Sequence, residues 1–154
     1  MKKIFLIAAL FTTSLAAMAQ NHVRNPKSKK EILNDQYASG LFKGAEGTIF
    51  DISNENVGGY LNILDWLQGR EAGLQIYVSG SGTRVPVIRG SVASVYVDEM
   101  LMDASFLNSL SINDIGMIKV IKGPFVGAIG NGAGGTIAIY TIRADDEEFD
   151  LDSD

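Results

Sequence analysis

The sequence predicts an α+β fold, with a small mixed sheet of about four to six strands and two or three short helices. Three observations lead to this prediction. Residues 74–78 strictly alternate apolar and polar side chains, as a half-buried strand does. Residues 60–70 place leucines at helical spacing. Residues 111–141 contain two β-branched segments about fifteen residues apart, joined by a glycine-rich loop, which suggests a compact crossover.

The first nineteen residues have the three parts of a secretory signal peptide. Lys2 and Lys3 form the basic start, residues 4–15 form the apolar core, and residues 17–19 fit the small-residue cleavage rule. We therefore expect cleavage before Gln20 and export of residues 20–154; the alternative is an uncleaved anchor. The rest of the chain predicts no membrane helix. Because the chain has no cysteine, disulfides and cysteine-ligated zinc are excluded.

We expect residues 20–47 to begin as a basic linker and to continue as a short helix or an irregular segment. Basic residues between positions 21 and 30 can touch anionic lipid or nucleic acid, but export argues against nucleic acid as a partner. The single histidine, His22, lies here without a second catalytic group nearby, so we predict that it is inert.

The domain itself is predicted to span residues 48–144. Its expected strands are residues 48–52, 74–78, 94–98, 117–121 and 136–142, and its expected helical segments are residues 60–70, 104–110 and 111–115. The helix at residues 60–70 should end at its following glycines, and Trp66 on its apolar side is predicted to be a core residue rather than a ligand platform. Lys119, the one charge in its strand, is expected to point out of the pleat.

A glycine-rich loop, GNGAGG, occupies residues 130–135 and matches the pattern G-x-G-x-x-G. A dinucleotide fingerprint must open a helix, whereas a β-type segment follows here, so we predict no nucleotide cofactor. Glycines instead supply positive φ angles and close backbone approach. We expect this structural role for Gly123, Gly130, Gly132 and Gly135, and we expect valine at Gly132 or Gly135 to destabilise the domain.

Residues 118–141 resemble the end of the plug domain of TonB-dependent outer-membrane receptors. The shared features are a strand ending in a Lys-Gly-Pro-like step, a glycine-rich loop, and a strand closing on Thr141. Residues 63–76, ILDWLQGREAGLQI, resemble the family's helix, Gln-Gly-Arg step, Ala-Gly step and strand, in the version typical of starch-utilisation (SusC-like) receptors of Bacteroidota. The resemblance extends over residues 62–141.

The resemblance implies four candidate residues for interaction with a partner, namely Arg70, Arg89, Gly90 and Asp98. Arg70 belongs to the Gln-Gly-Arg step, and Arg89 and Gly90 match the family's Ile-Arg-Gly step. Asp98 matches the aspartate of an Asp-Gly hairpin turn, but Glu99 replaces the glycine, which leaves the geometry of the turn open. Family resemblance implies that Arg89 faces acids on a barrel wall; an ion pair within the domain, to Asp98 or Glu99, is the alternative.

The resemblance implies a plug domain that takes part in outer-membrane substrate uptake without catalysis. In the family, a plug closes a β-barrel, and an energy-coupling protein pulls on a short N-terminal box. No barrel segment follows residue 141 here, and no coupling box is recognisable in residues 20–47. We therefore expect a stand-alone or split plug in the periplasm or at the periplasmic face of the outer membrane. Its expected partner is a separately encoded β-barrel or a periplasmic protein; the alternative function is a periplasmic adaptor that reuses the fold.

The sequence does not support an enzymatic function. There is no nucleophile elbow and no metalloprotease motif, and the acids Asp98, Glu99 and Asp103 lack calcium-loop spacing, so we predict no catalytic or metal site. The last ten residues, 145–154, are mostly acidic and carry the net negative charge of the exported chain. We expect them to be a disordered, solubilising tail; a docking strip for a basic partner is the alternative.

Overall fold

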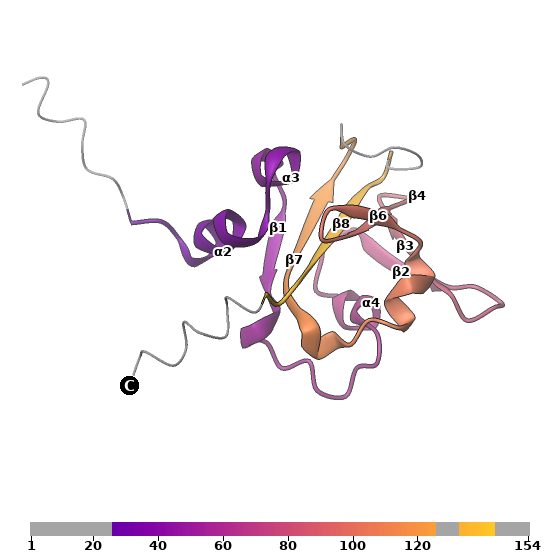
Figure 1. Cartoon of the computed structure of the whole chain (residues 1–154). Helices are drawn as coiled ribbons and strands as arrows, with labels where there is room; N and C mark the ends of the chain where they lie inside the picture. Colours follow the sequence, from indigo (N-terminus) through magenta and orange to yellow (C-terminus); the bar gives the residue numbers. More distant parts are fainter. Residues whose placement is uncertain (1–25, 126–132, 144–154) are drawn as a thin grey trace, which may run out of the picture.

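The computed structural model describes residues 26–125 and 133–143 (Figure 1). The signal peptide, the acidic tail, Gly130 and Gly132 lie outside these residues, so the predictions made for them stay predictions. Within them, the predicted α+β fold is confirmed. The mixed sheet has five strands, in agreement with the predicted four to six, and an antiparallel sheet of three strands accompanies it. In the described ranges, no helix combines the length and apolarity that crossing a bilayer requires.

Sheet A contains five strands. In spatial order they are β1 (Thr48–Asp51), β7 (Ile115–Lys122), β8 (Gly135–Thr141), β5 (Ser94–Val97) and β6 (Met100–Met102). Strands β5 and β8 pair in parallel and the other pairs are antiparallel. Strand β8 is interior to the sheet, since it lies between β7 and β5. Interior strands are covered on both faces, which explains their continuous apolar sequence.

Sheet B is an antiparallel meander of β2 (Leu74–Val78), β3 (Arg84–Ile88) and β4 (Ser91–Val92). The strand pattern in the sequence predicted β2 but not β3 or β4. Pro86 in the middle of β3 weakens the strand signal, because proline has no N–H to donate to a sheet ladder. A two-residue strand such as β4 is too short for any periodicity to show.

One face of sheet A packs against sheet B and a short helix, α4 (Ile63–Leu67). The Asn62 side chain accepts a hydrogen bond from the Leu64 N–H (2.9 Å) and so caps the start of α4. Gly69, with φ of +81°, follows its end. Trp66 is completely buried and meets Phe50 edge-on, with ring centroids 5.7 Å apart, so the core role predicted for it is confirmed.

The opposite face of sheet A is covered by α2 (Lys29–Tyr37) and α3 (Gly40–Gly44). These two helices fill the stretch for which a helix or an irregular segment was expected, and Figure 1 shows them beside β1 and β7. Lys119 of β7 points toward them and is buried. Its ammonium donates to the Asn34 amide oxygen and to the Phe42 carbonyl, both at 2.7 Å. The ammonium therefore caps the end of α3, although burial lowers the pKa of Lys119.

Three short 3-10 helices complete the described fold. They are η2 (Ile52–Asn54), η3 (Ala104–Asn108) and η4 (Ile112–Asp114). The predicted helical segments at residues 104–110 and 111–115 therefore form, but as single tight turns. Asp103 begins η3, with its carboxylate accepting the Ser105 N–H at 2.8 Å. Such turns change the chain direction between β6 and β7 over few residues.

Candidate functional site

Several motif residues meet at one end of the domain, which we call the motif end. It consists of the loop at residues 68–73, the turn Arg89–Gly90, residues 122–123, and residues 134–135. The Arg89 N–H donates to the Gly73 carbonyl at 3.1 Å, which joins the first two parts. The Gly123 N–H donates to the Gly134 carbonyl at 3.3 Å, which joins the last two.

Arg89 and Gly90 form the two-residue turn between β3 and β4. Their φ angles are +53° and +83°, and Ile88 pairs with Ser91 across the turn, so it is a type I′ hairpin turn. The Arg89 side chain is exposed and makes no hydrogen bond or ion pair with another described residue. The alternative of an ion pair to Asp98 or Glu99 is wrong, because both acids lie at the opposite end of sheet A.

Arg70 is bound to its own loop. Its guanidinium lies 4.4 Å from the centroid of the Trp66 ring and 5.5 Å from that of Tyr60. It also donates a hydrogen bond to the Trp66 carbonyl at the end of α4. Cation–π contact and helix capping together hold the loop after α4 against the core. In this geometry Arg70 stabilises the motif end, although the residue is exposed.

Glu71 was missed by sequence reasoning. Its side chain is almost fully buried and forms an ion pair with Lys122 at the end of β7. This pair ties the Gln-Gly-Arg loop to the Lys-Gly-Pro step, although fifty residues separate the two in the sequence. A buried carboxylate without its cation is strongly unfavourable. Nothing in the local pattern around Glu71 signals burial, because its partner lies in a distant strand.

The glycines of the motif end allow backbones to approach closely. Gly135 has φ of +135°, and a Cβ placed on it would lie 2.3 Å from the Ile121 carbonyl oxygen. Gly134 has the same restriction, because its Cβ would lie 2.5 Å from the Ser91 carbonyl oxygen. Gly123 has φ of +100° in open space. Gly134 and Gly135 are therefore the points at which β8 meets β7 and the β3–β4 turn.

Asp98 and Glu99 form a second type I′ turn, between β5 and β6, at the far end of sheet A. Their φ angles of +47° and +67° are unusual for residues other than glycine. The Asp98 carboxylate accepts bonds from the Thr141 N–H (3.0 Å) and hydroxyl (2.9 Å). The Glu99 carboxylate accepts bonds from the Ser39 N–H (2.6 Å) and hydroxyl. These bonds hold a turn geometry that glycine normally supplies, so Asp98 is engaged within the domain.

We expect Glu99→Ala to destabilise the domain more than Glu99→Gly. Both changes remove the bonds to Ser39, but only glycine also relieves the positive φ, which costs roughly 1 kcal/mol in alanine. Urea unfolding of the two variants measures the difference. Glu46→Ala is a suitable control, because Glu46 is exposed and has no partner within the described residues. Equal unfolding free energies for the two Glu99 variants would show that the turn is not strained.

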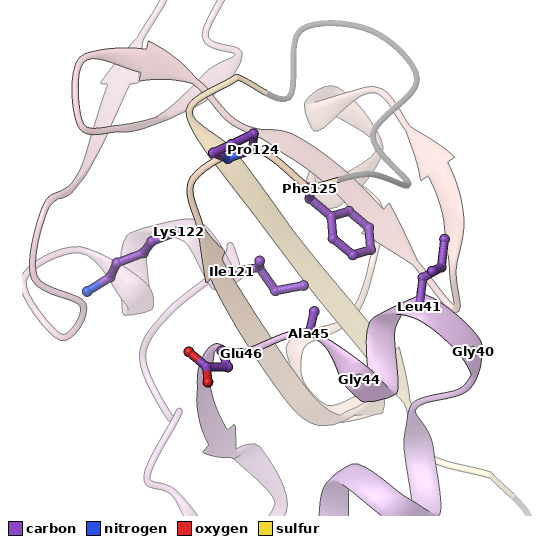
Figure 2. Close-up of a pocket in the computed structure, with 9 residues that line it drawn as sticks. All are labelled: Gly40, Leu41, Gly44, Ala45, Glu46, Ile121, Lys122, Pro124 and Phe125. Atoms are coloured by element: carbon purple, nitrogen blue, oxygen red, sulfur yellow. The ribbon is translucent and has the colours of Figure 1, made fainter.

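A cleft of about 500 Å³ opens beside the motif end, between α3 and the end of β7 (Figure 2). Its lining residues are Gly40, Leu41, Gly44, Ala45, Glu46, Ile121, Lys122, Pro124 and Phe125. Figure 2 shows that the Lys122 side chain points away from Phe125, in keeping with its ion pair to Glu71. The lining is mainly apolar, and its charged residues are Glu46 and Lys122. Across the described residues, no group of three potential metal ligands comes together.

No protein-family model matches the chain, and no curated protein matches it. Solved structures do match. The RagAB peptide transporter aligns at 24% identity and a TM-score of 0.52, over 64% of this chain and 12% of that chain. The siderophore receptor PirA from Acinetobacter baumannii aligns at 19% identity and a TM-score of 0.51, over 76% of this chain and 19% of that chain.

A third structure gives the same result. The ferric yersiniabactin uptake receptor FyuA from Yersinia pestis aligns at 20% identity and a TM-score of 0.51, over 67% of this chain and 18% of that chain. This chain therefore spans less than a fifth of the length of each of these proteins. At such identities the likeness concerns the fold: the chain shares the fold of one segment of a peptide transporter, a siderophore receptor and a ferric yersiniabactin uptake receptor.

Proposed function

We propose that this chain is a plug-type domain of the TonB-dependent receptor class and serves outer-membrane uptake as a non-catalytic component. The observation that carries the proposal is the shared fold. It covers 64% to 76% of the chain and matches part of a peptide transporter and of siderophore receptors, at TM-scores of 0.51 to 0.52. The Gln-Gly-Arg, Ile-Arg-Gly and Lys-Gly-Pro steps, which resemble that class, meet at one end of this fold.

The geometry of the motif end divides the candidate residues by role. Arg89 stands on a rigid type I′ turn with its guanidinium exposed, so it is the residue placed to pair with a carboxylate outside the domain. Arg70 and Glu71 hold the supporting loop through Trp66 and Lys122. Asp98 holds the opposite turn through Thr141. We propose that Arg89 contacts the wall of a β-barrel, while the other residues keep its turn in place.

Site-specific crosslinking tests this assignment. A photo-reactive amino acid replaces Arg89 in the full chain, which is expressed in its native cell and irradiated before fractionation. We expect an adduct with a β-barrel protein in the outer-membrane fraction. Asn113 is the matched control position, because it is exposed and lies in η4 at the other end of sheet A. A probe there should give little of this adduct.

The result also separates the two candidate functions. Adducts from position 89 with periplasmic proteins alone would contradict the uptake proposal and favour an adaptor that reuses the fold. In the uptake case, Arg89→Glu should weaken recovery of the barrel protein, because it places like charges opposite each other. Arg89→Lys should retain most of the recovery, since it keeps the positive charge. Unchanged recovery with Arg89→Glu would remove Arg89 from the interface.

A further inference from the structure

Strand β6 (Met100–Met102) is an exposed edge of sheet A. It pairs with β5 on one side, and no described strand pairs with it on the other. Met100 is 58% exposed and Leu101 is 51% exposed. Natural edge strands are protected by shortness, lysine, proline, a bulge or a covering helix. β6 has only three residues, but the described residues provide none of the other protections. The other edge strand of sheet A, β1, is covered by α2 and by an ion pair between Lys29 and Asp51 (2.7 Å).

A groove of about 510 Å³ runs beside β6, between it and sheet B. Its apolar lining comes from β3, β4, β5 and η3, and includes Val85, Pro86, Val92, Ala93, Val95 and Ala104. Unpaired backbone groups on an edge, next to a groove for side chains, are the two features of a strand-addition site.

Acidic residues flank β6 at both ends. Glu99 precedes the strand, and Asp103 follows it and lines the groove. Hydrogen bonds from Ser105 lower the pKa of Asp103, so its carboxylate is ionised at neutral pH. No cation pairs with Asp103 within the described residues. The rim of the groove therefore favours a segment that carries basic residues.

The flanking charges also disfavour a second copy of this chain as the occupant. Two β6 strands paired antiparallel about Leu101 would place Glu99 of one copy opposite Asp103 of the other. Like charges directly opposite each other destabilise a strand pair. An extended peptide with basic ends avoids the repulsion, and its alternate side chains can enter the groove.

We propose that the outer edge of β6, together with this groove, binds an extended peptide segment by strand addition. The peptide backbone pairs with β6, alternate apolar side chains enter the groove, and a lysine or arginine meets Asp103. Recognition is directed mainly at the backbone, so it tolerates different apolar sequences. This inference goes beyond the proposed role in uptake and does not depend on it.

A titration of the full, ¹⁵N-labelled chain tests the proposal. The probe is a short synthetic peptide in which valine and threonine alternate between two terminal lysines. We expect saturable shifts of the amide signals of Met100, Leu101 and Met102. The control peptide has the same side chains but N-methylated backbone amides, which cannot pair with a strand. It should produce no saturable shift.

Variants of the chain locate the site. Leu101→Lys should weaken peptide binding by about tenfold, which corresponds to about 1.4 kcal/mol. Leu61→Lys is the matched control, because Leu61 is 91% exposed, lies outside the groove and should bind normally. Asp103→Asn keeps an oxygen to cap η3 while removing the charge. It should weaken binding by a smaller factor and reduce the salt dependence of the affinity.

Three results would overturn the proposal. The first is the absence of shifts at residues 100–102. The second is equal binding of the N-methylated peptide, which would mean that the groove takes apolar groups without strand pairing. The third is concentration-dependent dimerisation that Leu101→Lys abolishes, which would assign the edge to a second copy of this chain.

Discussion

Gly135→Ala is expected to lower the free energy of unfolding by roughly 3 kcal/mol, enough to leave a domain of this size barely folded. Two penalties add at this position. The φ of +135° is unfavourable for a residue with a side chain, and the new methyl group would lie 2.3 Å from the Ile121 carbonyl oxygen. The obstacle is backbone in β7, so it cannot move aside without breaking the pairing of β7 with β8. Denaturant unfolding measures the loss.

Two further glycine variants separate these penalties. Gly82 has φ of +81° in open space, so Gly82→Ala should cost only about 1 kcal/mol, from backbone strain alone. Gly134 does not have positive φ, but its Cβ would lie 2.5 Å from the Ser91 carbonyl oxygen, so Gly134→Ala reports the clash alone. A Gly135→Ala variant as stable as Gly82→Ala would show that β7 and β8 do not approach as closely as described.

Trp66→Ala is expected to cost about 3 to 5 kcal/mol, the range for removing a large buried aromatic side chain. Trp66 is fully buried between α4 and sheet A, where it packs against Phe50. It also supports the Arg70 guanidinium, 4.4 Å from its ring. Its loss should therefore both open a cavity and loosen the Gln-Gly-Arg loop. Calorimetric or denaturant unfolding measures the first effect, and hydrogen exchange at residues 68–73 measures the second.

Trp66→Phe is the matched control for this prediction. The indole N–H of Trp66 has no hydrogen-bond partner among residues 26–125 and 133–143, so replacing the indole by a phenyl ring leaves no group in these ranges newly unsatisfied. The remaining cost comes from lost volume and should be clearly smaller than that of alanine. If phenylalanine were as damaging as alanine, the indole N–H would have a role that the described contacts do not include.

Local sequence patterns predicted five of the eight described strands and the helix near residues 60–70. Strict alternation at residues 74–78 predicted β2, and the β-branched segments predicted β7 and β8. Leucine spacing predicted a helix over residues 60–70, of which only Ile63–Leu67 is helical. Each signal depends on the periodicity of one segment, which a strand or helix imposes on its own residues. The same signals were weak for β3, which contains Pro86, and for β6, which has only three residues.

The positions of individual side chains depend on which distant segments pair with each other. Local sequence patterns do not show this pairing. Arg89 and Asp98 are nine residues apart in the sequence. Strand β5 runs between them, so Asp98 lies at the end of sheet A away from the Arg89 turn. Glu71 and Lys119 are buried, and their partners lie on elements that are far away in the chain. The sequence by itself therefore determined the class of fold and most of its strands, because periodicity is local. Only the tertiary structure decided which charges are buried, paired or exposed, because strand register and packing bring those groups together.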